Sequence, residues 1–271
     1  LAAPEHDLFE RVVEFLAQRR ILVAWDLDDA AAQYPAETPR DVFFWEFMES
    51  AQTVAARLES IGIAVVGVNE TARQLCQSLA ASGAGPRLII DDPLLRNLSL
   101  FDGDTVVQER WNNSGSIVAA DRWEQALVEH NIGCVVATGD HGGTHHFNRW
   151  NARCLEKELH FFPVLLRQYQ GLVGPFVIPG ETACYACYRA RDNSAKPSPS
   201  RLPYEQSPTH AWQSAVGYLP PMATMLGALA SVELIKFYAQ LLPSAASRVI
   251  EFNFIGSKAT PRPILKVPRC P

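Results

Sequence analysis

Short apolar runs alternate with helically spaced segments through the middle of the chain. Residues 63–66 form an apolar run, residues 71–79 have one apolar face at helical spacing, and residues 87–90 form a second run. The alternation continues with an apolar run at 134–140, a helical segment at 147–159 and a further run at 160–166. Continuous apolar runs are typical of strands covered on both faces, and strands that alternate with helices predict a parallel sheet. The fold class predicted is therefore α/β.

The ends of these predicted strands carry glycine or acidic residues. Gly67 ends the first run, Asp91 and Asp92 end the second, and Asp140 ends the third. A strand, a glycine turn, a helix and a strand with an acidic end form the opening of a nucleotide-binding βαβ unit. The central region is thus predicted to have a Rossmann-like nucleotide-binding fold.

The C-terminal third has a different pattern. Residues 190–221 are rich in Ser and Pro and are predicted to form a long crossing loop, which is usually functional or mobile. Residues 221–240 form a strongly apolar helix, and residues 248–254 and 264–267 have strand periodicity.

The N-terminal segment predicts a small separate element. Leu8, Val12 and Phe15 recur at helical spacing, and residues 21–23 form a short apolar strand. An acidic stretch with two prolines follows and suits a linker. We therefore place a small N-terminal module with its linker at residues 1–40 and the main domain at 41–271. The aromatic cluster at 43–47 is interpreted as packing between the two.

Two cysteines three residues apart follow a Pro/Gly-rich turn. Cys184 and Cys187 have the spacing of a zinc-binding pair, and a closed zinc site needs four ligands. Cys270 is the candidate third ligand, and the fourth is expected beyond Pro271. A redox pair or two buried free thiols are the alternatives. The three cysteines at 76, 134 and 154 lie in apolar segments and are interpreted as buried thiols.

Composition and charge narrow the range of partners. The chain has 48% hydrophobic residues and 24 basic against 29 acidic residues, a net charge of −5 without a long basic run. Nucleic acid is therefore not an expected partner. No apolar run is long enough to span a membrane, and the chain is expected to be cytoplasmic. A histidine cluster at 141, 145 and 146 has no standard metal-ligand spacing, so a metal is not expected there.

These motifs together resemble the ThiF/MoeB/HesA superfamily, whose members have the fold of ubiquitin-activating-type adenylating enzymes. Val65-Val66-Gly67 with Asp91-Asp92, then Asn97-Leu98, Asp140 and the cysteine set carry the resemblance over residues 60–271. The stretch from Gly174 to Cys187 is most similar to ThiF-like partners of azole- and azoline-forming peptide cyclodehydratases. The resemblance implies a ThiF-type domain with structural zinc and a partial N-terminal winged-helix-like element. It also implies a role in making thiazole- or oxazole-modified ribosomal peptides, with delivery of a leader-bearing precursor to a YcaO-type catalyst.

The sequence departs from an active adenylating member at the phosphate site. Asn69 and Ala72 stand where glycines are expected, Glu70 adds a negative charge, and Leu100 stands near the position of an expected cation. Arg96 could in principle substitute for that cation. These departures predict that the residues of the nucleotide site are relics of the fold. The relics are Gly67, Asn69, Asp91, Asp92, Asn97 and Asp140.

Two functions of different classes follow from the resemblance. The first is a catalytically silent scaffold that binds a precursor leader by strand addition to an exposed edge. Its peptide-binding residues would be Phe9, Val12, Val13, Ile21, Leu22 and Val23. The second is an enzyme that uses ATP to adenylate a peptide or carrier-protein carboxylate, so ATP is a doubtful cofactor and zinc the expected one. The resemblance and the apolar helix at 222–240 also predict a symmetric homodimer.

Overall fold

The computed structural model describes residues 3–18, 38–47, 49–141, 143–195, 217–241, 246–268 and 270. The chain divides into two compact units, Leu1–Ala56 and Arg57–Pro271. The first unit contains α1 (Ala3–Gln18), α2 (Pro39–Trp45) and the beginning of α3 (Ala51–Ile61). The boundary placed at residue 40 from the sequence falls within this unit, and the predicted strand at 21–23 lies outside the described residues.

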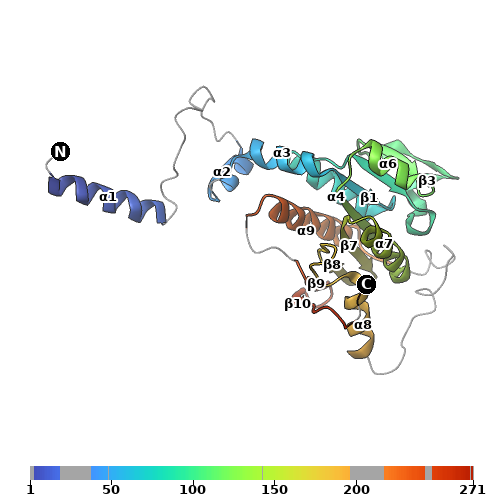
Figure 1. The fold of residues 1–271 in the computed structure, drawn as a ribbon. Helices are drawn as coiled ribbons and strands as arrows, with labels where there is room; N and C mark the ends of the chain where they lie inside the picture. Colours follow the sequence, from blue (N-terminus) through green and yellow to red (C-terminus); the bar gives the residue numbers. More distant parts are fainter. Residues whose placement is uncertain are drawn as a thin grey trace. The chain divides into compact units, whose positions relative to one another are not determined.

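The second unit is built on one eight-stranded sheet, in the order β10-β9-β8-β7-β6-β1-β2-β5. Figure 1 shows the course of the chain through this unit, from α4 to β10. The strands from β5 to β7 pair in parallel, and β8, β9 and β10 continue the sheet in antiparallel pairs. The strands are β1 (Ile63–Val66), β2 (Leu88–Asp91), β5 (Ser116–Ala119), β6 (Cys134–Gly139), β7 (His160–Arg167), β8 (Gln170–Val173), β9 (Arg248–Asn253) and β10 (Lys258–Pro263). The sheet therefore has a parallel half and an antiparallel half. A hairpin of β3 (Phe101–Asp102) and β4 (Thr105–Val106) forms a separate small sheet.

Helices cover both faces of this sheet. On one face α4 (Glu70–Ala81) packs against α9 (Pro220–Tyr238), and both contact the central strands. The two helices approach closely at Gly227, where a Cβ would lie 2.6 Å from the backbone nitrogen of Leu75. On the other face α6 (Trp123–Glu129), α7 (Thr144–Glu156) and α8 (Tyr185–Ala195) share one core with alternate residues of β1 and β2. Short helical segments are α5 (Gln108–Trp111), η2 (Pro93–Leu95) and η3 (Leu98–Leu100).

The double cover explains the continuous apolar runs of the sequence. All four residues of β1 are buried, with Ala64 and Val66 in the core under α6, α7 and α8. A strand without a solvent-facing side has no position for a polar residue. The predicted α/β class and parallel succession of strands are confirmed.

Several predicted elements are corrected by the structure. Residues 264–267 are not a strand, because the last strand is β10, which contains Pro261 and Pro263 and lies at the sheet edge. An edge strand tolerates proline since one side needs no ladder hydrogen bonds. Residues 190–195 of the predicted loop belong instead to α8, and residues 196–216 lie outside the described residues. Within the described residues, no helix is both long and apolar enough to cross a bilayer.

Candidate functional site

The carboxyl ends of β1 and β6 meet at the point where the strand order of the parallel half reverses. β1 pairs with β2 on one side and with β6 on the other, so chain connections leave this point in opposite directions. Ligands of open α/β sheets bind in the crevice at such switch points. Gly67 follows β1 here with a φ of +100°, and Asp140 follows β6. Gly67 and Asp140, which the sequence assigned to a nucleotide site, therefore lie at this switch point.

Asn69 fills the turn between β1 and α4. Its side-chain oxygen accepts the N–H of Ala72 at 2.9 Å, and its amide nitrogen donates to the carbonyl oxygens of Leu95 and Thr138 at 2.9 and 3.1 Å. A Cβ on Gly67 would lie 2.6 Å from that amide nitrogen. The side chain of Asn69 is fully buried, so it occupies the volume beside the glycine turn that a phosphate-cradling loop leaves open.

Asp140 is bound on all sides by groups of the chain itself. One carboxylate oxygen accepts the backbone N–H of Glu70 at 2.9 Å, the amide of Asn97 at 2.7 Å and the hydroxyl of Tyr218 at 2.7 Å. The other oxygen lies 3.2 Å from Nδ1 of His141. The carboxylate thus takes the place at the start of α4 where a helix N-terminus can hold an anion.

The protonation states at Asp140 follow from these contacts. Burial by itself would raise the pKa of Asp140, but the bonds from His141, Asn97 and Tyr218 outweigh burial and hold that pKa below its ordinary value. Burial and the neighbouring carboxylate raise the pKa of Tyr218 far above its ordinary value. Asp140 is therefore ionised and Tyr218 is a donor at neutral pH.

The two acidic residues at the end of β2 are also paired. Arg96 binds Asp91 through two bonds of 2.8 and 2.7 Å and binds Asp104 at 2.8 Å. Asp92 accepts bonds from Arg149 at 2.6 Å and from the indole of Trp150 at 2.8 Å. Arg96, the candidate replacement for the missing cation, is therefore held by two carboxylates.

The segment after Asn97 cannot present a cation to this site in its present packing. Asn97 caps η3, and its side-chain oxygen accepts the N–H of Ser99 at 3.0 Å. Leu100 is only 2% exposed and belongs to the core. A basic residue at that position would have to bury its charge or displace η3.

Three cysteine sulfurs meet at the start of α8. The Sγ atoms of Cys184 and Cys187 are 3.8 Å apart, and that of Cys270 lies 3.4 and 3.1 Å from them. Thiolates at about 2.3 Å from a tetrahedral zinc lie about 3.8 Å from one another. The distances between the three sulfurs are therefore close to those between three ligands of one zinc ion. The backbone N–H of Val267 points to the sulfur of Cys187 at 3.5 Å. This arrangement fits a metal ion, and three cysteines of the predicted site are brought together.

The acidities of these thiols differ. Burial opposes ionisation of Cys187, but the N–H of Val267 and the adjacent thiols outweigh it and lower the pKa of Cys187. Burial and the neighbouring sulfurs raise the pKa of Cys270 to about 12. A bound metal ion would displace the protons of these three thiols, because cysteine binds a metal ion as the thiolate.

The histidine cluster does not form such a site. Among the described residues, the three cysteines form the one group of three close His, Cys, Asp or Glu ligand atoms. The rings of His145 and His146 lie with centroids 3.8 Å apart and planes tilted by 46°. Burial, followed by the charge of His145, lowers the pKa of His146 to about 4. The remaining cysteines at 76, 134 and 154 are buried and free, as predicted.

The predicted peptide-binding residues lie partly on α1. Phe9 and Val12 are 58% and 46% exposed, and Val13 is half-buried. Leu8 and Phe15 extend the same exposed apolar surface. Ile21, Leu22 and Val23 lie outside the described residues.

Sequence reasoning missed the residue that closes the switch-point site. Tyr218 lies at the end of a Ser/Pro-rich stretch and reaches Asp140 and Asn97, which are 78 and 121 residues away along the chain. Its neighbours in the sequence carry no motif, so the only available signal was the interpretation of that stretch as a functional loop.

Comparisons with solved structures support the same fold. The structure of E. coli MccB with MccA-N7isoASN matches with a TM-score of 0.69 and 17% identity, covering 97% of this chain and 80% of that chain. A structure described as a heterocyclase in complex with substrate and cofactor matches with a TM-score of 0.56 and 14% identity, covering 97% of this chain and 30% of that one. The heterocyclase TruD matches with a TM-score of 0.60 and 16% identity over 98% of this chain and 34% of its own length.

No protein-family model and no curated protein sequence matches the chain. At these low identities the structural matches establish the fold alone. The chain shares with these structures a mixed α/β fold, which here is built on one eight-stranded sheet.

Proposed function

We propose that this protein is a catalytically silent ThiF-like scaffold that binds the leader of a ribosomally made precursor peptide. In this proposal it delivers the peptide to a YcaO-type cyclodehydratase, which forms azolines from Cys, Ser and Thr residues. The protein's own task is binding and presentation, and nucleotide chemistry belongs to the partner.

The observation that carries the proposal is the occupation of the switch-point site by the chain itself. The carboxylate of Asp140 accepts bonds from Glu70, Asn97 and Tyr218, and Asn69 fills the glycine turn. A phosphate and its metal ion would need the volume and the bonding partners that these side chains use. Retention of the fold without an open phosphate site is what a delivery protein requires.

The peptide-binding part of the proposal is supported by α1 and by the solved structures. MccB has been solved with the peptide MccA, and a heterocyclase of this fold has been solved with its substrate. The exposed apolar face of α1, with Phe9 and Val12, offers packing area beside which a leader strand could add.

A structural zinc ion completes the proposed scaffold. Cys184 and Cys187 would hold it at the start of α8, and Cys270 would tie the C-terminal segment to that helix. A closed thiolate site binds zinc without an open position, so the ion would contribute folding energy and no catalysis.

The second candidate function is adenylation of a peptide carboxylate by this chain. It is favoured by the presence of Asp140 and Asn97 side by side at the switch point, and by a matching structure of MccB with AMPCPP and MccA at a TM-score of 0.64. Catalysis would require Tyr218 and Asn69 to leave their positions when ATP binds.

Leader binding can be tested by fluorescence polarisation. The probe is the leader of a Cys/Ser/Thr-rich precursor peptide, labelled with fluorescein, and the protein is the full chain. Leu22→Pro removes a backbone donor from the predicted edge strand and should weaken binding at least tenfold. Val12→Ser should weaken binding by roughly three- to tenfold through lost apolar contact.

Arg11→Ser, on the same helix and exposed, is the matched control and should leave the affinity unchanged. Unchanged affinity in both Leu22→Pro and Val12→Ser would remove the N-terminal module from the leader site. No binding of the intact chain to the peptide would contradict the scaffold function itself.

We also propose that the protein is a symmetric homodimer. A groove of about 560 Å³ between α9 and the strands β9 and β10 is lined mainly by apolar side chains, among them Met225, Leu229, Val232 and Phe252. The apolar side chain of Val232, which lines this groove, is 48% exposed. Sedimentation should give a dimer for the native chain and a monomer for Val232→Asp, and a native monomer at micromolar concentration would contradict the proposal.

A further inference from the structure

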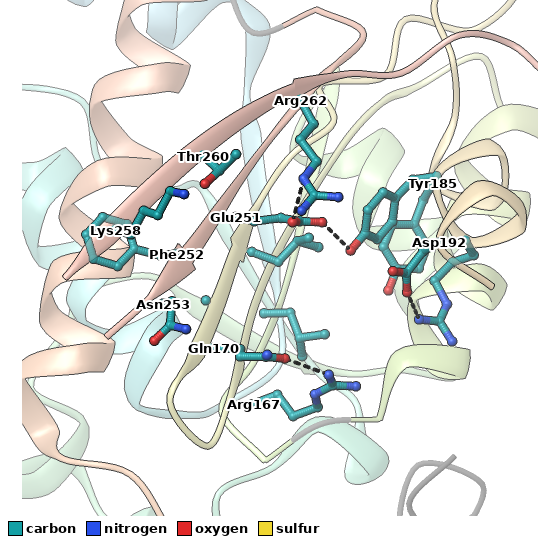
Figure 2. Close-up of a pocket in the computed structure, with 15 residues that line it drawn as sticks. Arg167, Gln170, Tyr185, Asp192, Glu251, Phe252, Asn253, Lys258, Thr260 and Arg262 are labelled. Carbon is teal, nitrogen blue, oxygen red and sulfur yellow. Dashed lines mark hydrogen bonds and ion pairs between the residues drawn. The ribbon is translucent and has the colours of Figure 1, made fainter. Parts of the chain in front are cut away.

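The antiparallel half of the sheet carries a cavity that the proposed function does not use. It has a volume of about 480 Å³ and lies between the ends of β7, β8, β9 and β10 and the helix α8 (Figure 2). Leu165 and Leu172 line it from the sheet, and Tyr185 and Tyr188 line it from α8. Cavities of about 300–1,000 Å³ are the size that small ligands and short peptide segments occupy.

The two faces of β9 and β10 differ in chemistry because side chains alternate along a strand. Ile250, Ala259 and Pro261 line the apolar groove on the α9 side. Glu251, Lys258 and Arg262 line the cavity on the α8 side. Thr260 pairs with Glu251 in the register, which places the polar positions of both strands on one face. The polar face is thus a consequence of the strand pattern and not of one isolated residue.

The lining of the cavity is positively charged within a negatively charged chain. Four basic residues (Arg167, Arg189, Lys258 and Arg262) face two acidic ones (Asp192 and Glu251), whereas the whole chain has a net charge of −5. A local excess of positive charge attracts anionic ligands to a cleft.

The two carboxylates of the cavity are already engaged. Glu251 accepts from Arg262 at 2.9 Å and from the hydroxyl of Tyr188 at 3.3 Å, and Asp192 accepts from Arg189 at 3.4 Å (Figure 2). Lys258 is exposed and has no ionic partner among the described residues. The cavity therefore offers cationic donors and apolar surface together, with its acidic groups neutralised.

We propose that this cavity binds a short acidic segment of a peptide, with carboxylates on Lys258 and Arg262 and an apolar side chain between the tyrosines and the leucines. The inference rests on the proposed function in one respect, since it takes the ligand to be a peptide. A carboxylate suits the site better than a phosphate, because Glu251, although paired with Arg262, repels a dianion more strongly than a single negative charge.

The cysteine site positions one wall of this cavity. Tyr185 directly follows Cys184, and Tyr188 directly follows Cys187, so both tyrosines are carried by the turn that the sulfurs hold. The N–H of Tyr185 also donates to the side chain of Asn151 at 3.0 Å, which fixes the start of α8 on α7.

The test is an NMR titration of the ¹⁵N-labelled full chain with two probe peptides. Acetyl-Glu-Leu-Glu-amide should bind and shift the amide signals of Lys258, Thr260 and Arg262, and acetyl-Gln-Leu-Gln-amide should bind at least tenfold more weakly. Lys258→Gln should weaken binding of the acidic probe by about five- to tenfold, and Arg262→Gln by about tenfold. Binding of the acidic probe should also weaken as salt is raised, because the site is partly exposed.

Lys157→Gln is the matched control. It removes one positive charge from the end of α7, where Lys157 pairs with Glu124 on the surface at 2.8 Å, and should not alter the affinity. Equal binding of the two probes, tighter binding of a phosphoserine analogue, or unchanged affinity in both cavity variants would overturn the inference.

The result is separable from the test of leader binding. If the fluorescein-labelled leader binds but the acidic probe does not, the inference fails and the proposed function stands. If the acidic probe binds at residues 258–262 while the leader does not bind, the cavity is a peptide site and the scaffold proposal fails.

Discussion

The two halves of the sheet carry two sites in opposite states. In the parallel half, the switch-point site is filled by its own residues, with Asp140 and Asn69 fully bonded inside the chain. In the antiparallel half, the cavity beside α8 is open, and Lys258 has no ionic partner among the described residues.

This difference indicates which half of the protein is suited to ligands. The buried polar groups of the switch point are not left without hydrogen bonds in the absence of a phosphate, because other groups of the chain supply their partners. In the cavity of the antiparallel half, Lys258 has no ionic partner among the described residues. The fold therefore indicates the switch point as a ligand site, whereas the unpaired charge of Lys258 indicates the cavity in the antiparallel half.

Breaking the cysteine site should have the largest effect on both halves. Cys184→Ser or Cys270→Ser removes a metal ligand, and loss of a structural zinc ion can cost most of the folding free energy of the segment that it holds. We expect protease-sensitive or insoluble protein, and about one zinc ion per native chain by metal analysis. Cys76→Ser is the control, since Cys76 is a buried free thiol outside the cluster. Fully stable, metal-free protein would contradict this role.

Restoring a cation at the switch point should damage the fold without creating activity. Leu100 is buried, so Leu100→Lys forces a charge into the core, and we expect a loss of about 3 kcal/mol or more in the free energy of unfolding. Denaturant titration measures the loss, and an ATPase assay should find no turnover. Leu98→Lys is the exposed neighbouring control and should change the stability little.

Restoring the glycine turn should have a smaller effect. Asn69→Gly removes the cap of α4 and leaves the carbonyl oxygens of Leu95 and Thr138 without their donor. We expect a loss of about 2–3 kcal/mol by thermal or denaturant unfolding, with no gain of nucleotide binding. An Asn69→Gly variant that hydrolyses ATP would show that a single side chain blocks a working site.

The last of these effects concerns pH. The pKa of His146 is lowered by burial from 6.5 to about 4, so the unfolded chain binds a proton more readily than the folded chain does between these values. Stability should therefore rise as pH increases from about 4 to 6.5, by at most about 1.4 kcal/mol per pH unit from this group.

His146→Gln should flatten this part of the stability profile in urea titrations at several pH values. The charged groups that face His146 are His145, Asp92, Arg149 and His141, so His145→Gln serves as the control that changes a neighbour's charge. An identical slope in His146→Gln and the native chain would assign the pH dependence to other groups.

The fold was predictable where burial of a strand on both faces produces a continuous apolar run in the sequence. Residues 63–66 and 134–139 are continuous apolar runs because helices cover both sides of β1 and β6. The edge strand β10 was missed because its two prolines argue against a strand in the sequence, although an edge strand tolerates them. Strand β5 was missed because its exposed residues break the apolar pattern.

Only those parts of the sites that depend on the spacing of neighbouring residues could be predicted from the sequence. Cys184 and Cys187 were evident from their spacing, and Asp140 from its position after an apolar run. The bond from Tyr218 to Asp140 and the gathering of positive charge beside α8 depend on contacts between segments far apart in the chain, which no local pattern encodes.

The central claim is that the switch-point site does no nucleotide chemistry, and ATP–pyrophosphate exchange tests it most directly. The assay uses the intact purified chain with magnesium, ATP, labelled pyrophosphate and the precursor peptide, beside an Asp140→Ala variant. The account predicts exchange at the background level for both proteins. Peptide-dependent exchange by the native chain that is lost in Asp140→Ala would contradict it and establish adenylation as the activity.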